Sequence, residues 1–412
     1  MKKHVTVCSV LVGIALTIFV LATCSSGSGD EEPPATTYPI TVLPTGATGS
    51  EAVTANVTEA EAGTTVTLTA TLGSGRRVAL NAASVPINSS TISVNGGTAT
   101  FMMPNTAVTI TATYSFTPTH PAGYAESHTA NSTSFNMHYV PSGGTFIMGE
   151  HVETTTQTVT LTKNFWMGET EVTQGLWEAV WGTTWPGTDP DGSGYGAGAS
   201  YPAYFVNWYD AVAFCNLLTI ADSTIADTER VYYYDADLTT VYTKTHAANH
   251  NKVYIDWSKK GYRLPTSAEW EYTARYVDGT SWTRGDHVSG GPVYTDETDP
   301  DKIGDYAWYF GNNGAIGSTT YANKEVGQKK ANALGLRDMS GNVWEMCSDW
   351  WVPVYSVLVG TDPVGPSTGM YPNIRGGTWE IRSHQIMCAL NGACDTESSN
   401  TVLGFRLCRT AD

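Results

Sequence analysis

The stretch Arg375-Gly376-Gly377-Thr378-Trp379 carries the most structural information in this sequence, and the later run Leu403-Gly404-Phe405-Arg406 completes it. Other segments with clear strand, helix or turn patterns precede this closing pair. They lie at residues 146–149, 165–177, 206–218, 261–272 and 334–351. One such segment alone would carry little weight, but together they describe a single domain of about two thirds of the chain.

Two of these segments contain signals for the start of a helix. Thr173 stands between a strand pattern and a helical one, where a threonine hydroxyl can cap the first turn. Thr266 and Glu269 have the spacing of a capping box. Residues 206–218 place apolar side chains at helical spacing. The sequence therefore predicts helices after Thr173 and Thr266, and a third helix over 206–218.

In content and order, the segments resemble the formylglycine-generating enzyme family, whose members are also called sulfatase-modifying factors. The resemblance covers residues 131–412. It implies an irregular α+β domain related to the C-type lectin fold, with short strands, two main helices and long loops. It also implies that Trp344 and Thr378 line the family's active-site cleft.

The family's copper-binding cysteines correspond here to Ile381 and Ile386. A thiolate is the soft ligand that holds Cu(I), and an alkyl side chain cannot replace it. Cys388 and Cys394 are candidates for displaced copper ligands, although their spacing differs from the family's. The sequence therefore predicts the fold without copper and without catalytic residues. The alternative is a formylglycine-generating oxidase or a related oxidoreductase.

In the resembled fold, residues 379–387 lie on the ligand-facing surface, and their Arg and Met are residue types enriched at interfaces. The alternative is that Ile381, Ile386 and Met387 pack inward. The predicted ligand-contacting residues are Trp344, Thr378, Trp379, Glu380, Ile381, Arg382, His384, Gln385, Ile386 and Met387. Treponemal variable lipoproteins, which retroelements diversify, vary the same stretch of this fold, and the resemblance implies such diversification here.

Oxygen donors surround a glycine turn between Asp338 and Glu345, an arrangement that suits Ca²⁺. The resemblance implies a structural calcium ion held by the side chains of Asp338, Asn342 and Glu345 and by the carbonyl of Ser340. The alternative is a hydrogen-bonded turn without metal.

Residues 1–24 have the pattern of an export signal, with Lys2 and Lys3 before a long apolar stretch. The end of this stretch resembles a bacterial lipobox, which implies a lipid on Cys24 and a location in the cell envelope, exposed at the surface. An uncleaved membrane anchor is the alternative, because the stretch is almost long enough to span a bilayer. Residues 25–37, rich in small polar residues and proline, are predicted to form a flexible tether.

Residues 38–115 alternate β-branched and small residues between turn residues, which predicts an all-β module. The segment resembles Ig-like repeats of bacterial surface proteins, most of which serve as stalks. Residues 116–130 are predicted to be a linker.

The net charge of −17 argues against nucleic acid as a partner. The resemblance also implies a disulfide between Cys215 and Cys408.

The sequence as a whole thus predicts a multidomain, lipid-anchored protein of the bacterial envelope. A small β module is followed by a formylglycine-generating-enzyme-type domain that binds a protein or glycan ligand outside the cell.

Overall fold

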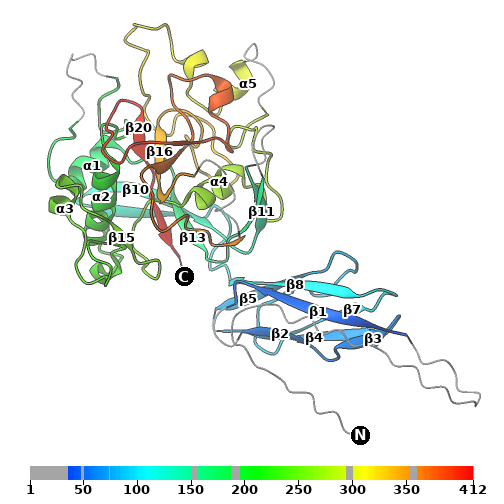
Figure 1. The fold of residues 1–412 in the computed structure, drawn as a ribbon. Coiled ribbons are helices and arrows are strands. Elements are labelled where there is room, and N and C mark those ends of the chain that lie inside the picture. Colours follow the sequence, from blue (N-terminus) through cyan, green and yellow to red (C-terminus); the bar gives the residue numbers. More distant parts are fainter. Residues whose placement is uncertain are drawn as a thin grey trace, which may run out of the picture. The chain divides into compact units, whose positions relative to one another are not determined.

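The computed structural model describes residues 36–47, 51–73, 75–149, 156–186, 195–293, 300–352 and 360–411. The chain forms two compact units, Met1–Tyr114 and Ser115–Asp412 (Figure 1). The predicted signal peptide with Cys24 lies outside the described residues, as does almost all of the predicted tether. No helix in the described parts of the chain is long and apolar enough to cross a membrane.

The first unit consists of two small β-sheets. Their strand orders are β3-β1-β8-β5-β6 and β2-β4-β7. The strands are β1 (Thr37–Thr45), β2 (Ala52–Ala55), β3 (Glu59–Glu61), β4 (Thr65–Thr71), β5 (Arg76–Asn81), β6 (Thr91–Ile92), β7 (Thr98–Met102) and β8 (Val108–Phe116). Alternate side chains of β4 and β8, such as Val66, Leu68 and Ile110, are buried because successive strand residues point to opposite faces. They build a hydrophobic core that belongs to this unit alone.

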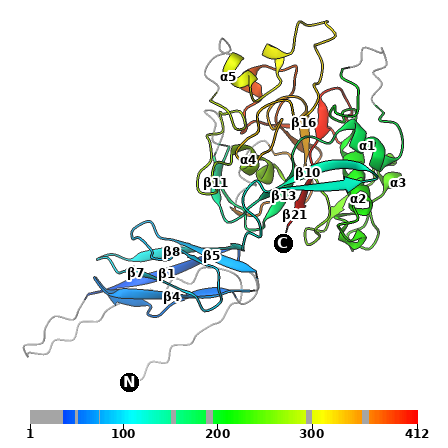
Figure 2. The same cartoon turned by 180° about the vertical axis from the view of Figure 1, so that it is seen from behind.

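The second unit contains several small sheets rather than one large one. Their strand orders are β21-β13-β10-β9, β11-β12-β17, β14-β15 and β19-β18-β16-β20. The strands are β9 (Ala125–Ala130), β10 (Thr133–Val140), β11 (Thr145–Met148), β12 (Gln157–Thr160), β13 (Phe165–Gly168), β14 (Tyr232–Tyr233), β15 (Tyr254–Ile255), β16 (Trp344–Trp350), β17 (Gly360–Thr361), β18 (Pro372–Arg375), β19 (Asn391–Ala393), β20 (Leu403–Phe405) and β21 (Cys408–Thr410). Seen from behind, β10, β13 and β21 run side by side (Figure 2).

Helices are short and few in the described part of this unit. They are α1 (Gln174–Trp181), α2 (Trp208–Ala221), α3 (Lys244–Ala248), α4 (Ser267–Arg275) and α5 (Pro300–Gly304), with 3₁₀ turns at Asp227–Glu229, Phe310–Asn312 and Ser383–Gln385. The unit is therefore irregular and loop-rich, as predicted. However, β-structure outweighs helix more than the expected α+β class suggests.

The predicted helix starts are confirmed. The Thr173 hydroxyl accepts a hydrogen bond from the Leu176 amide at the start of α1. Thr266 and Glu269 form the reciprocal capping box of α4. The helix predicted over 206–218 is α2, which begins after the N-cap Asn207. These caps satisfy backbone amides that the first turn of a helix leaves without partners.

The predicted linker at 116–130 is wrong in its second half. Strand β9 occupies Ala125–Ala130 and pairs antiparallel with β10. Although the sequence of β9 is mostly polar, His128 points inward and is buried. Its Nδ1 lies 2.8 Å from Asp222 Oδ2. The partner of His128 lies far along the chain, so the sequence of β9 alone does not indicate that this polar residue is buried.

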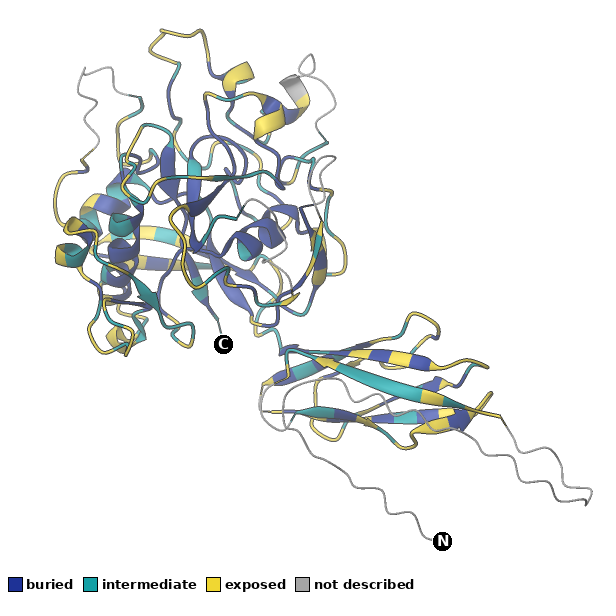
Figure 3. Ribbon diagram, in the orientation of Figure 1, coloured by how far each residue is buried: buried dark blue, intermediate teal, exposed yellow. Residues whose placement is uncertain are grey.

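The core of the second unit surrounds α2 and the sheet that contains β16 and β18. Helix α2 is apolar on almost every side and its residues are largely buried, as the dark blue ribbon shows (Figure 3). All four residues of β18 are buried. This sheet therefore forms a rigid base for the segment that follows Arg375.

Candidate functional site

The two segments 375–379 and 403–406, together called the closing frame, each contain a fully buried arginine, Arg375 and Arg406. Arg375, the last residue of β18, donates to Glu271 Oε2 at 2.9 Å and to Ser267 Oγ at 2.8 Å. It also donates to the carbonyl oxygens of Cys388 and Leu390. Because these partners come from α4 and from the loop beyond the turn, one guanidinium ties three segments together.

Close packing requires a glycine at position 377. Gly377 has a φ of +79°, and a Cβ there would lie 2.7 Å from Ile386 Cγ2 and 2.8 Å from the Gln385 carbonyl oxygen. Only glycine adopts this conformation readily and leaves room for the returning chain. The backbone therefore brings Gln385 and Ile386 back against Gly377.

Arg406 makes the second buried ion pair. Its guanidinium donates to Glu345 Oε1 at 2.7 Å and to Oε2 at 2.9 Å, and Trp270 Nε1 donates to the same Oε2 at 2.6 Å. The carboxylate thus receives three charge-assisted or neutral hydrogen bonds. Paired groups of this kind keep buried charges compensated.

Ile381 and Ile386, at the positions of the family's copper cysteines, are packing residues. Ile386 is fully buried in a small apolar cluster with Val288, Ile303 and Tyr309, and Ile381 packs against the same cluster. The Phe310 amide also donates to the Ile381 carbonyl at 2.9 Å. The two isoleucines therefore fasten the turn to the region of α5, and the expected alternative of inward packing holds for Ile386.

The described cysteines are all free, so the implied Cys215–Cys408 disulfide is not formed. Cys215 is buried on α2, and the Cys408 thiol instead lies 3.9 Å from Glu269 Oε2. Burial raises the pKa of Cys388 and of Cys394 to about 12 in each case. Cys388 belongs to the core around Tyr272 and Met339, whereas Cys394 packs against the core around α2. The two thiols therefore lie in different cores.

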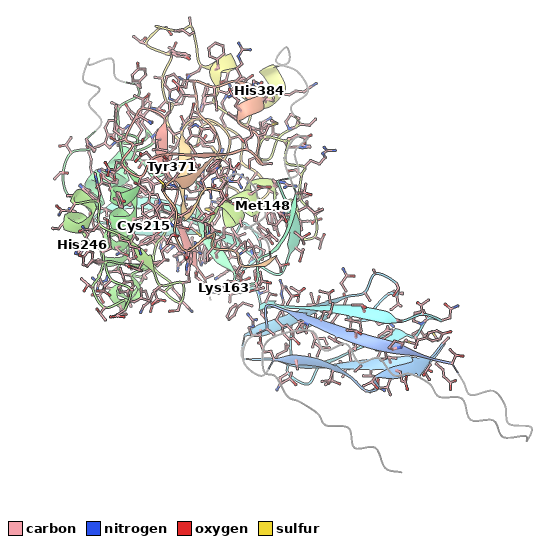
Figure 4. The ribbon with its side chains drawn as sticks, in the orientation of Figure 1. Met148, Lys163, Cys215, His246, Tyr371 and His384 are labelled. Atoms are coloured by element: carbon pink, nitrogen blue, oxygen red, sulfur yellow. The ribbon has the colours of Figure 1, made fainter. Side chains whose placement is uncertain are left out.

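The predicted ligand-contacting segment divides into an interior and an exterior half. Thr378, Trp379, Ile386 and Met387 are buried, so they support the turn instead of contacting a ligand. Trp344 and Ile381 are partly buried. The exposed members are Glu380, Arg382, His384 and Gln385. Figure 4 shows His384 on the short helical turn at the edge of the unit.

Trp379 is the centre of an aromatic group that the sequence did not indicate. Its ring stacks on Tyr195 at a centroid distance of 5.7 Å and meets Tyr321 edge-on at 4.9 Å. Tyr195 and Tyr321 come from loops far away in the sequence and belong to no motif, so only the fold reveals them. Burial, together with the nearby Glu380 carboxylate, raises the pKa of the Tyr321 hydroxyl.

The donors predicted for calcium fit only in part. Glu345 is occupied by Arg406, and the Asn342 side-chain oxygen accepts from the Lys324 amide at 3.0 Å. Asp338 does fit, because its Oδ1 is buried without a partner while Oδ2 accepts from the Gly327 amide at 2.6 Å. Within the described residues, no group of three His, Cys, Asp or Glu side chains is arranged to hold a metal ion.

A buried acid that the sequence analysis did not select lies in the same region. Both carboxylate oxygens of Glu171 are buried without a hydrogen-bond partner. Burial raises the pKa of Glu171 well above its usual range, and the Asp338 and Glu345 carboxylates raise it further against the opposing effect of Arg406. Burial likewise raises the pKa of Asp338 to about 6. Arg406 and Arg337 are the cations that lower the pKa of Asp338 against this effect.

The family model of the sulfatase-modifying factor enzyme 1-like domain matches residues 123–411, which is well over half of the chain. The chain belongs to this family. The match begins ahead of the predicted boundary at residue 131 and includes β9.

Within the family, curated relatives match part of the chain. The chaperone protein LppX of Paenibacillus barcinonensis is 35% identical over 45% of this chain and 62% of its own length. The formylglycine-generating enzyme of Streptomyces coelicolor is 32% identical over 41% of this chain and 55% of its own length. The chain thus spans little more than half the length of these relatives.

A solved structure, Treponema denticola variable protein 1, superposes on the chain with a TM-score of 0.56 and 29% identity. The superposition covers 71% of this chain and all of that protein. The similarity confirms the domain type that the motifs predicted.

Proposed function

We propose that this family member is a cell-envelope lipoprotein whose second unit binds a protein or glycan ligand without formylglycine chemistry. The packing of Ile381 and Ile386 at the cysteine positions is the observation that carries this proposal. Neither isoleucine can bind Cu(I) or attack a substrate. In this proposal, the segment around Ile381 and Ile386 therefore serves as a binding surface.

The contact surface in this proposal is the exposed turn formed by Glu380, Arg382, His384 and Gln385, which we call the 380–385 turn. It offers a carboxylate, a guanidinium, an imidazole and an amide within a few residues, a mixture suited to polar recognition. The turn is held in place by the Gln385 amide, which donates to the Arg382 carbonyl at 2.9 Å, and by buried Ile386. A surface that is already ordered loses less entropy on binding.

The envelope location rests on the lipobox-like sequence at Cys24 and on the similarity to LppX and to the treponemal variable protein. In this proposal the first unit is an Ig-like stalk. The similarity to a protein named as variable also supports diversification of the C-terminal stretch. A near-identical genomic template repeat that differs at adenines would accompany such diversification.

The triple substitution Arg382→Ala, His384→Ala and Gln385→Ala should abolish ligand binding, because it removes most of the exposed polar side chains of the turn. Binding to arrays of purified proteins and glycans measures this effect. The change in melting temperature should be small, since exposed positions contribute within about 0.5 kcal/mol of stability. Lys260→Ala, which removes an exposed charged side chain from a segment far from the turn in the sequence, is the control. Array signals that survive the triple substitution would remove the turn as the binding surface.

We also propose that Ca²⁺ binds beside the 338–345 turn through Asp338 and Glu171 rather than through the full predicted donor set. Support comes from the unpartnered carboxylate oxygens of these two residues and from the electrostatic effect of the Asp338 and Glu345 carboxylates on Glu171. Carboxylate oxygens are the ligands that Ca²⁺ prefers. A bound ion would stabilise the second unit without taking part in a reaction.

Calcium should therefore raise the thermal stability of the wild-type protein relative to EGTA, by about 2.7 kcal/mol when its concentration is a hundredfold above Kd. Glu171→Gln should remove the difference between calcium and EGTA, as measured by calorimetry. Asp237→Asn, an exposed position, is the matched control and should preserve it. Superimposable melting curves of the wild type in calcium and EGTA would show that no such ion binds.

A further inference from the structure

A groove lies at the other end of the β16–β18 strand pair from the 380–385 turn. Glu345 of β16 pairs with Arg375 next to the turn, whereas Trp350 pairs with Pro372 at the opposite end. Two adjoining hollows of about 260 Å³ and about 300 Å³ open there and share Trp208, Lys252 and Trp350 in their walls. We call them together the aromatic groove.

The aromatic groove and the 380–385 turn are separate surfaces. Figure 1 places β15, which contributes Tyr254 to the groove, on the far side of the unit from α5, which lies next to the turn. Figure 4 likewise shows Tyr371, close in sequence to the groove residue Gly369, well apart from His384. A ligand of the groove is therefore independent of a ligand of the turn.

Aromatic rings form the walls of the groove. Trp350 packs on Trp208 with ring centroids 5.3 Å apart, and Trp208 meets Tyr209 edge-on at 5.6 Å. Tyr254 and Trp257 line the neighbouring hollow. Trp208 is buried, whereas the other four rings are partly accessible. Binding sites for small ligands combine such apolar walls with a few polar groups that fix orientation.

The polar groups of the groove are hydroxyls and one lysine. Ser367 and Thr368 are exposed at its rim. The Lys252 ammonium lies 4.8 Å from the centroid of the Tyr254 ring, and none of the ion pairs among the described residues includes it. The neighbouring His250 does have an acidic partner, Glu397, at 3.0 Å. In a chain of net charge −17, a lysine that no acid pairs with inside an aromatic groove favours an anionic ligand.

We propose that the aromatic groove binds an acidic oligosaccharide. Sugar rings have apolar C–H faces that stack on aromatic rings, and hydroxyl edges that hydrogen-bond to groups such as Ser367 and Thr368. Two ring-sized hollows side by side suit two linked sugars better than one compact ligand. A carboxylate or sulfate on one sugar then pairs with Lys252. This site is distinct from the turn in the proposed function and does not depend on it.

The test uses the full-length protein on an array of acidic and neutral oligosaccharides, with an oligo-glutamate peptide as a third probe. Acidic glycans should bind, and their binding should weaken with added salt because the pairing with Lys252 is partly exposed. Lys252→Met should weaken it about tenfold, the effect of losing a hydrogen bond to a charged group. Tyr209→Ala, which removes a partly exposed ring from the wall, should also weaken it.

Lys260→Met is the matched control, because it removes an exposed lysine outside the groove and should leave binding unchanged. The triple substitution in the 380–385 turn should leave it unchanged as well, so that this proposal and the proposed function fail separately. Absence of any bound acidic glycan, equal binding of neutral glycans, preference for the peptide, or indifference to both Lys252→Met and Tyr209→Ala would each overturn the proposal.

Discussion

Replacing Arg375 with methionine should lower the free energy of unfolding of the second unit by about 3–5 kcal/mol. Arg375 and Glu271 are both fully buried, and the substitution removes the cation from Glu271 Oε2 and leaves Arg275, 2.7 Å from Oε1, as the one ion-pair partner of this carboxylate among the described residues. Ser267 and the carbonyl of Leu390 lose their donor at the same time. Removing one partner of a buried ion pair is costly because the remaining charge cannot be solvated.

Urea denaturation followed by tryptophan fluorescence measures this loss. The chain has 13 tryptophans, and all of them lie beyond residue 165, so the signal reports on the second unit alone. Arg284→Met is the matched control, because the Arg284 side chain is 58% exposed and lies 3.6 Å from Asp286. An exposed pair of this kind contributes about 0–1 kcal/mol. Equal losses for the two variants would refute the structural role of Arg375.

Trp379→Ala should destabilise the second unit by a similar amount, about 3–5 kcal/mol, which is typical of emptying a buried tryptophan site. The Trp379 side chain is 1% exposed, and its ring contacts Tyr195 and Tyr321. The same urea titration measures this loss.

The paired substitution Arg382→Ala and His384→Ala should change stability by no more than about 0.5 kcal/mol, because both residues are exposed. The contrast separates residues that support the turn from residues that a ligand can touch. A wild-type unfolding midpoint for Trp379→Ala would instead place that ring at the surface, as the sequence had suggested.

The structural roles of the two buried arginines explain how the closing frame persists without the family's cysteines. Arg375 and Arg406 each pair with a buried carboxylate, and Gly377 leaves room for Gln385 and Ile386 to pack against it. The ion pairs and the packing at Gly377 are requirements of the fold, and they do not depend on copper. A match to the frame therefore identifies the domain and leaves its chemistry open.

Local signals in the sequence were sufficient to predict parts of this fold. The caps at Thr173 and Thr266 and the helix α2 follow from interactions between residues close in the chain, and the structure contains all of them. The alternation over 38–115 likewise predicted the strands of the first unit. Such features depend on spacing, which one sequence displays directly.

Features that depend on tertiary contacts were predicted less well. Whether Trp379 faces a ligand or the interior is decided by Tyr195 and Tyr321, which the sequence does not connect to it. Glu345 has the right position for a calcium ligand in the sequence, but Arg406 occupies it in the fold. The polar sequence of β9 is typical of a linker, because the buried partner of His128, Asp222, lies far along the chain.

The most direct test of the proposed function is metal analysis of the purified protein after loading with Cu(I) and exhaustive dialysis, together with an assay for oxygen-dependent conversion of a cysteine-bearing peptide. We expect no retained copper and no conversion, because Ile381 and Ile386 are packed in an apolar cluster and the thiols of Cys388 and Cys394 lie in different cores. Close to one equivalent of copper, lost on Cys388→Ser and accompanied by conversion of the peptide, would contradict the account and identify the protein as an oxidase.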